Sequence, residues 1–534
     1  MLKELEQIKA RYKKARAKAD MWAPLFEACY HYTVPSRNMY YWTSQYQGAQ
    51  KNARVFDSTG ITALRNFVSK IQSGLCPPQT RWFLHEAGEL VPPEAREQLN
   101  KDLQQYSETI YYYLRKSNFD ICVAESFFDL GLGTGCLICN PGNSDENPLE
   151  FYSVPLARVA LEETITNSLE TNYRWWDEVR IEDIIELWPK AQLTPTMVAL
   201  YEEDKAATVK TLVEGTVYFP TNPPKKRYRY VVFSESDSST FLVDEWLESS
   251  PWVVFRWSKV NNETLGRGPV VDSLPAIMTL NELMRLEIAS SNFNVARPMM
   301  AYSDGVFNPW TMKLEPNSII PVAPNAAGQW PIQPFPDTSP PQFVQTLAVD
   351  LRQQINTLLF ANPIGQPQDN PTRTATELML RQRNLAEEIG AAFTRLQNEF
   401  LAKVLARVSY ILEKRGLIEQ IKIDNRLVKL SYKSPLVVGQ GQQDVQNFIN
   451  WYQLMQGVQG PEAALINLKP ERFAHWSAGK MGVDTDPIVG EKEMAQFLKE
   501  QSEKSQEQEM MAAEAQQQQM MQQGMKAGGT PSGQ

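Results

Sequence analysis

The segment "NPIGQPQDNPTRTATELMLRQRN", residues 362–384, decides how the chain is organised. Its first half is a polar loop, rich in proline and glutamine, with Ile364 as the one large aliphatic residue. Its second half begins a helix, where Thr374 and Glu377 form a capping box that can satisfy backbone N–H groups otherwise left unpaired. The sequence therefore predicts a polar loop held directly in front of a strong helix.

The helix that follows this loop is predicted to be unusually long. From Leu378 to Ile411, apolar residues recur at steps of three, four and seven, and Gly416 ends the pattern. A helix of about 40 residues would span roughly 60 Å at a rise of 1.5 Å per residue. Since this exceeds the usual length of a globular helix, we expect a structural spine.

A proline-rich insert lies upstream of the polar loop, at residues 297–341. Its ten prolines exclude long helices and central strands. Trp310, Trp330 and Phe335 favour a small module of edge strands and turns, because a disordered linker would be poorer in aromatic residues.

Two helices are predicted to flank this insert. The first has Ser273 as a candidate N-cap, with Pro275 in the first turn where its missing N–H does no harm, and ends near Asn294. The second runs from about Phe343 to Leu359. The two helices are thus predicted to flank a compact Pro-rich module that joins their ends.

The remaining chain combines helical and strand patterns, so the predicted fold class is mixed α+β and rich in helix. Residues 1–125 read as mainly helical, whereas 150–262 contain the β-branched and aromatic runs TVKTLVEGTVYF, YRYVVF and WVVFRW, which predict strands. Residues 440–500 read as short helices. The last residues, 501–534, form a Gln/Met-rich tail that cannot build a core of its own.

The N-terminal segment places Leu2, Leu5, Ile8 and Tyr12 at helical spacing among many lysines and arginines. Such a helix can lie on a membrane or on nucleic acid, or it can dock on the protein by its apolar stripe. We favour the docked helix. The segment has no apolar core of the kind that a secretory signal requires.

The composition is that of an ordinary globular protein, with 43% hydrophobic and 22% charged residues among 534. No run approaches the roughly 18 apolar residues of a membrane span. Five cysteines, an odd number, indicate free thiols in a reducing compartment. The net charge of −9 argues against a protein that grips DNA over a wide surface.

No motif in the sequence assembles an active site. GLGTGCLIC, residues 131–139, lacks the spacing of a dinucleotide-binding loop, and its single CxxC lacks a second pair for zinc. It predicts instead a glycine-containing turn that enters a buried strand, with Cys136 and Cys139 as small hydrophobic residues. His85 has no second histidine at zinc-protease spacing. We therefore expect no enzyme activity, no cofactor and no metal site.

The order of helix, Pro-rich insert, helix, polar loop and long helix resembles the portal, or head-to-tail connector, family of bacteriophages with short tails. Four strings are similar to marks of that family: DSTG at 57–60, GLCPPQTRWF at 74–83, LGRGP at 265–269 and, most specifically, TRTATELMLRQ at 372–382. The similarity runs from about residue 5 to about residue 500.

The resemblance implies a portal fold with named parts. These are a wing (1–268), a first stem helix (269–296), a clip (297–341), a second stem helix (342–360), a tunnel loop (361–374), the spine helix with a return to the wing (375–435), a crown (436–500) and the tail (501–534).

The resemblance also implies a function and a set of partners. Portal proteins form twelve-membered rings at one capsid vertex, around a channel for double-stranded DNA during packaging and ejection, and they bind terminase and then a tail adaptor. Scaffolding and major capsid proteins are further expected partners. The protein would thus be a virion component that assembles in the host bacterial cytoplasm.

The same resemblance assigns roles to single residues. Tunnel-loop side chains that would face the DNA channel are Gln366, Gln368, Asn370, Thr372 and Arg373. Trp310, Trp330 and Phe335 of the clip would lie at contacts with other subunits or with the adaptor. Two other classes remain open: another ring-forming head–tail adaptor, and a nucleotide-binding, DNA-processing enzyme built on GLGTG.

Overall fold

The computed structural model describes residues 2–37, 51–88, 90–165, 167–220, 227–236, 240–295, 299–301, 332–334, 341–361, 389–390, 392–419, 421, 428–433, 435–460 and 470–481. The chain divides into two compact units. The first unit contains residues 1–74, 109–373 and 389–420, and the second contains residues 75–108, 374–388 and 421–534. Each unit is described by itself.

The first unit contains an antiparallel five-stranded sheet of order β4-β5-β6-β7-β8. Its strands are β4 (Val159–Glu162), β5 (Thr171–Arg180), β6 (Thr208–Tyr218), β7 (Tyr228–Ser234) and β8 (Val243–Leu247). Alternate residues of each strand point to opposite faces, so neighbouring residues such as Leu212 and Val213 of β6 enter different hydrophobic clusters.

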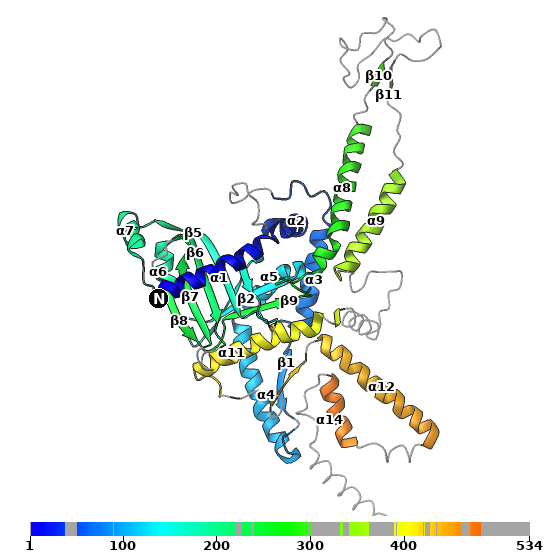
Figure 1. The fold of residues 1–534 in the computed structure, drawn as a ribbon. Coiled ribbons are helices and arrows are strands. Elements are labelled where there is room, and N and C mark those ends of the chain that lie inside the picture. The colour runs from blue at the N-terminus through cyan, green and yellow to red at the C-terminus, as the bar shows by residue number, and fades with distance from the viewer. Residues whose placement is uncertain are drawn as a thin grey trace, which may run out of the picture. The chain divides into compact units, whose positions relative to one another are not determined.

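Helices cover both faces of this sheet. Helix α1 (Leu2–Asp20) crosses one face, as Figure 1 shows, and buries Leu5, Ile8, Tyr12 and Ala15 against it. Helices α6 (Ile181–Leu187) and α7 (Pro195–Glu203) add their apolar residues to the cluster on the opposite face. The prediction that the N-terminal helix docks by its apolar stripe is confirmed.

A second sheet of the first unit has three antiparallel strands in the order β3-β2-β9. The strands are β2 (Thr134–Pro141), β3 (Leu149–Ser153) and β9 (Trp252–Arg256). Helix α5 (Phe119–Leu132) packs on this sheet, and the ring centroid of its Phe127 lies 6.0 Å from that of Phe255 on β9. Cys136 and Cys139 are buried on β2, so the predicted glycine turn and buried strand are confirmed.

The spine segment packs on the same sheet. Among the residues that the structure describes, the spine is helical at 389–390 and again from Ala392 to Lys414, with a π-helical turn, η3 (Gln397–Leu401), followed by α11 (Ala402–Lys414). Phe400 of the π turn lies with its ring centroid 4.6 Å from that of Phe255. The predicted helix start at Thr374 and Glu377 lies outside the described residues.

The remaining elements of the first unit are mostly helical. They are α2 (Ala23–Thr33), the 3-10 turns η1 (Pro35–Arg37) and η2 (Leu156–Arg158), α3 (Thr59–Leu75), the long α8 (Pro269–Val295), the short antiparallel strands β10 (Met299–Ala301) and β11 (Ile332–Pro334), and α9 (Pro341–Leu358).

The second unit is built on a two-stranded antiparallel ribbon, β1 (Phe83–Ala87) with β12 (Val428–Tyr432). Helix α4 (Pro93–Lys116) begins in this unit. The unit also contains α12 (Pro435–Gln459), which pairs with α14 (Pro470–Met481). Four aromatic residues, Phe448, Trp451, Phe473 and Trp476, join these two helices.

The mixed α+β class and the three predicted strand runs are confirmed. The prediction that Ser273 caps helix α8 is wrong. Helix α8 begins at Pro269, so Pro275 lies inside it, and Ser273 is fully buried with its hydroxyl donating to Val270 O at 3.2 Å. Pro269, which lies at the helix start, fills the role that a proline suits there.

The prediction of only short helices after residue 440 is also wrong, because α12 has 25 residues. Gly441 interrupts the apolar pattern for a packing reason. A Cβ atom there would lie 2.2 Å from the carbonyl oxygen of Lys480 on α14. The glycine therefore permits a close contact between the two helices and does not end α12.

Candidate functional site: the base of the paired helices

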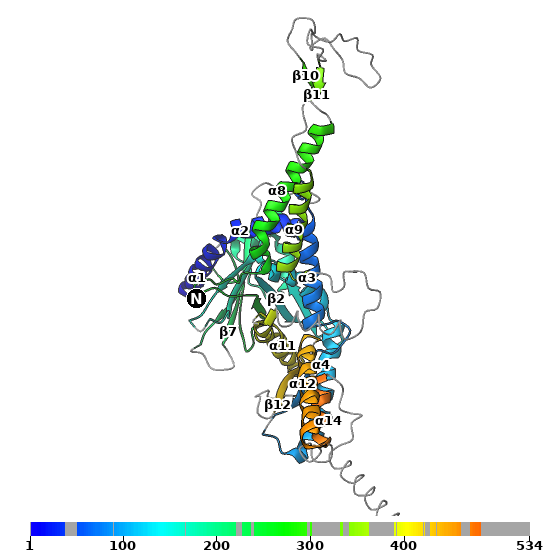
Figure 2. The ribbon, with the colours of Figure 1, turned by 90° about the vertical axis from the view of Figure 1, so that its right-hand side faces the viewer.

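Helices α8 and α9 of the first unit are separated in sequence but run side by side in both ribbon views (Figures 1 and 2). At the end of the pair that holds the N-terminus of α8 and the C-terminus of α9, both helices contribute buried residues: Val270, Ile277, Leu280 and Asn281 of α8, and Ala348 and Ile355 of α9. Farther out, the described residues 282–292 include no buried one. Leu286 and Ile288 are 51% and 44% exposed there. The pair is therefore held at one end.

Glycines fix the start of α8. Gly133 has a φ of +145°, and a Cβ atom on it would lie 2.0 Å from Gly266 O. A Cβ atom on Gly268 would lie 2.2 Å from Gly131 O, and Gly268 N donates to Leu132 O at 3.0 Å. The LGRGP segment thus fills the space beside the GLG turn with backbone, which leaves no cradle for a phosphate group there.

Asn281 ties α8 to the chain that leads into α3. This side chain is 6% exposed. Its Oδ1 accepts hydrogen bonds from the backbone N–H groups of Phe56 at 2.7 Å and Asp57 at 3.4 Å. Its Nδ2 donates to Arg54 O at 3.1 Å. A single amide therefore pairs three backbone groups with α8.

Asp57, the first residue of DSTG, ties α9 to the same place. Its Oδ1 accepts from Thr59 N at 2.7 Å and so caps α3, while Arg352 Nη2 of α9 donates to Oδ2 at 2.8 Å. Burial alone would raise the pKa of Asp57, but the hydrogen bonds from Thr59 and Arg352 outweigh burial and hold that pKa below its usual value. Asp57 therefore joins α3 and α9 as a carboxylate.

The inner end of α9 is held by α3 and by the chain after β9. Lys70 Nζ of α3 donates to Phe360 O at 2.9 Å. The ring of Phe360 lies 5.8 Å from that of Trp257, which in turn meets Phe67 of α3 at 5.2 Å edge to face. Leu359 is fully buried. The C-terminal end of α9, up to Ala361, is therefore held firmly by its neighbours.

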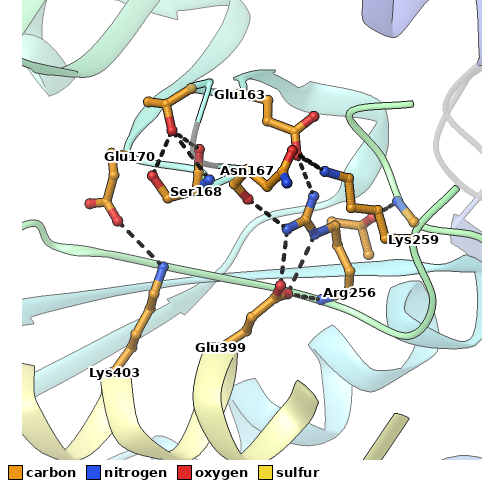
Figure 3. Close-up of polar contacts among 11 residues, drawn as sticks. Glu163, Asn167, Ser168, Glu170, Arg256, Lys259, Glu399 and Lys403 are labelled. Carbon is orange, nitrogen blue, oxygen red and sulfur yellow. Dashed lines mark hydrogen bonds and ion pairs between the residues drawn. The ribbon is translucent and has the colours of Figure 1, made fainter. Parts of the chain in front are cut away.

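An ion cluster around the buried Arg256 holds the spine segment in the first unit. Arg256, at the end of β9, lies between Glu163 and Glu399 in Figure 3. Its Nη2 donates to Glu399 Oε1 at 2.9 Å and its Nη1 donates to Glu163 Oε1 at 3.0 Å. Lys259 Nζ donates to Glu163 and to Asn167 Oδ1, the latter at 2.7 Å. The cluster joins the β4–β5 turn, β9 and the π turn of the spine.

The charges of this cluster balance. Burial lowers the pKa of Arg256, but its bonds to Glu399 and Glu163 outweigh burial and raise that pKa above the ordinary value. Burial raises the pKa of Glu163, and Lys259 and Arg256 overcome burial and hold it low. One helical turn after Glu399, Lys403 lies 3.8 Å from Glu170 (Figure 3). Paired in this way, the carboxylates join neighbouring segments of the chain and are not placed to act as general bases.

The described residues show neither a metal site nor a reactive thiol at these positions. They include no group of three or more His, Cys, Asp or Glu placed to hold a metal ion. Burial raises the pKa of the Cys136 thiol, and it raises that of Cys139 to about 12, so neither forms a reactive thiolate. Within those residues there is also no helix long and apolar enough to cross a membrane.

The residues predicted from sequence to form functional contacts all lie outside the described residues. This holds for the tunnel-loop residues Gln366, Gln368, Asn370, Thr372 and Arg373, for the cap residues Thr374 and Glu377, and for the clip residues Trp310, Trp330 and Phe335. Their predicted roles stay predictions.

The sequence did carry signals for part of the base. DSTG has an aspartate two residues before a threonine, which is a helix-capping pattern, and LGRGP has the glycines of the backbone contact. Nothing local marked Asn281 or Arg256, because each acts on residues 89 or more positions away.

The fold thus holds two long helices firmly at one end. A family described as "bacteriophage head to tail connecting protein" matches residues 5–489. The chain belongs to this family, so it is a connector of the bacteriophage head-to-tail junction and a component of the virion. The resemblance drawn from its sequence motifs is confirmed.

Comparisons with other proteins add little to this assignment. No curated protein matches the chain. One solved structure that is similar to it is titled "Neck of empty GTA particle computed with C6 symmetry". The two are 13% identical over 80% of this chain and 90% of the other, with a TM-score of 0.38. So loose a likeness carries no argument about function.

Proposed function

We propose that twelve copies of this chain form a ring at the unique capsid vertex, around an axial channel for double-stranded DNA. The ring passes DNA inward during packaging and outward during ejection. It is non-catalytic, and it serves as a platform for terminase and then for the tail adaptor. Scaffolding and major capsid proteins contact it within the head.

The parts of the proposed portal follow the chain. Helices α8 and α9 are the two stem helices, the elements before residue 269 form most of the wing, and α12 with α14 belongs to the crown. The clip is residues 297–341 and the tunnel loop is residues 361–374. The fastened base described above supports this assignment, because helices that line a channel must resist the force of moving DNA.

One observation carries the ring. Beyond Asn281, two large apolar residues of α8 are about half exposed within the described part of this chain: Leu286 is 51% exposed and Ile288 is 44% exposed. On α9, Val349 is 57% exposed. Exposed large apolar side chains on a firmly held helix pair offer a surface that another protein copy can bury. In a ring, the neighbouring copy covers it.

Charge supports the channel. The net charge of −9 per chain gives a ring whose field repels DNA phosphates. The polar tunnel loop, with Gln366, Gln368, Asn370 and Thr372, can exchange hydrogen bonds with phosphates and water without retaining either. Arg373 is its single cation. Such walls let DNA slide in both directions, which a basic groove would hinder.

The test compares two leucines of similar exposure in the same unit. Leu286→Asp alters the stem pair, and Leu187→Asp alters α6, where the leucine is 56% exposed. Both changes should leave the monomer folded, because each side chain is already half in water. By light scattering after size exclusion, Leu286→Asp should give monomers and Leu187→Asp should give rings. Rings from both variants would refute the proposed stem interface.

A further inference from the structure

Helix α9 ends in an unusual residue. Phe360 N donates to Thr357 O at 3.0 Å and Ala361 N donates to Asn356 O at 2.7 Å, which are the two bonds of a Schellman motif. The residue between them, Phe360, has a φ of +51°. That left-handed position is normally occupied by glycine, and a bulky side chain there is an outlier.

The same chain uses glycine where only the turn is needed. Gly416, which ends the spine, has a φ of +70°. Gly416 N donates to Glu413 O and Leu417 N donates to Leu412 O, both at 3.0 Å. No atom lies within 4 Å of the place where a Cβ on Gly416 would be. The hydrogen-bond pattern is the same, so the turn alone does not explain a phenylalanine at 360.

The surroundings of Phe360 explain the side chain. Its ring packs on Trp257, at 5.8 Å between centroids, and its carbonyl accepts from Lys70 at 2.9 Å. Phe67, which supports Trp257, lies three residues before Lys70 on α3 and therefore on the same helix face. Two groups of one helix thus hold the ring and the carbonyl. Leu359 and Ala361, on either side, are buried.

We propose that Phe360 is a positioning residue that fixes the direction in which the chain leaves α9. A glycine there would adopt the same turn but could rotate out of it, because both signs of φ are open to glycine. Phe360 stays in its strained conformation because its ring and carbonyl are held. The inference rests on the proposed function, in which the chain after Ala361 is the tunnel loop that meets DNA.

The test uses particles assembled with variant connectors. Phe360→Gly removes the ring but keeps the turn, and Phe360→Tyr restores an aromatic ring. Lys70→Met removes the donor to the carbonyl of Phe360, and Lys70→Arg restores a donor. Ring assembly is measured by light scattering, melting temperature by calorimetry, and packaged DNA by its retention in purified particles after mild heating.

Phe360→Gly should assemble rings with a melting temperature close to that of the unmodified protein, because relief of the left-handed strain offsets the lost ring contact. Its particles should lose packaged DNA, and Phe360→Tyr particles should retain it. Lys70→Met should show the same loss and Lys70→Arg should not. Normal retention in both Phe360→Gly and Lys70→Met would overturn the inference. So would failure of both variants to assemble, because their role would then be structural support alone.

Deletion of Pro367–Pro371 separates this inference from the proposed function. If the deletion impairs retention and Phe360→Gly does not, the tunnel loop stands and the positioning role fails. If neither change has an effect, the assignment of residues 361–374 to the channel fails. Loss of DNA in both, with rings intact, is the result that the inference predicts.

Discussion

Replacing Asp57 with alanine would remove the carboxylate that joins α3 and α9. Two contributions are lost. The cap on α3, in which Oδ1 accepts from Thr59 N at 2.7 Å, contributes about 1 kcal/mol. The ion pair with Arg352 contributes about another 1 kcal/mol at most, because the arginine side chain is 41% exposed and solvent weakens the pair. Local stability at this base should therefore fall by about 2 kcal/mol.

Hydrogen exchange followed by mass spectrometry measures this loss where it occurs. A loss of about 2 kcal/mol should reduce the protection of amides in the first turn of α3 and in α9 by roughly thirtyfold. Asp57→Asn keeps an oxygen that can cap α3 but loses the negative charge. For that variant, protection should fall by about fivefold, and only in α9.

Asp272→Asn is the matched control, because Asp272 is an exposed acidic residue in the first turn of α8. It should leave protection at α3 and α9 unchanged. The pKa of Asp57 lies below its ordinary value, so the ion pair contributes above about pH 4 and is lost as the pH falls through the folded pKa. Unchanged protection of α9 in Asp57→Ala would refute the role given to this residue.

Three further predictions concern other parts of the chain. Arg256→Met leaves Glu399 without its cation, whereas Glu163 keeps Lys259, so the free energy of unfolding should fall by about 1–3 kcal/mol; an unchanged thermal melt would contradict this. Burial lowers the pKa of His85 to about 4. The unfolded state, where histidine titrates near 6.5, therefore binds the proton first, and stability should fall between about pH 6.5 and about pH 4 by up to ~1.4 kcal/mol per pH unit. The acid-unfolding profile of His85→Asn should lack that component, and identical profiles would argue against it. Trp330→Ala should weaken ring assembly or adaptor docking while the monomer stays folded, and normal assembly with normal tail attachment would remove the support for the clip.

Features set by neighbouring residues were predictable from the sequence. The stripe of Leu5, Ile8 and Tyr12 predicted that α1 would dock, and those residues are buried on the sheet. The strands β6, β7 and β9 were marked by their β-branched and aromatic runs. The prediction of a glycine-containing turn that enters a buried strand at Cys136 was also confirmed. In each case the pattern lies within one element.

Features that depend on residues far away in the sequence could not be predicted from local patterns. Strand β1 was missed because its pairing strand, β12, begins 345 positions after Phe83. Ser273 was wrongly predicted to cap α8, since the contact of Gly268 with Gly131 beside the helix start joins segments 137 residues apart. Local rules suggested Ser273 as a cap, but tertiary contacts favoured Pro269. The ion cluster of Arg256 has the same origin, because its carboxylates come from two remote segments.

The most direct test of the account is an electron micrograph of the purified full-length protein. The account predicts rings with a central hole, and averaged top views should show twelve-fold symmetry. The same preparation of Leu286→Asp should show separate monomers. A compact monomer or dimer from the unmodified protein, at concentrations used for assembly, would contradict the claim that this connector forms a channel.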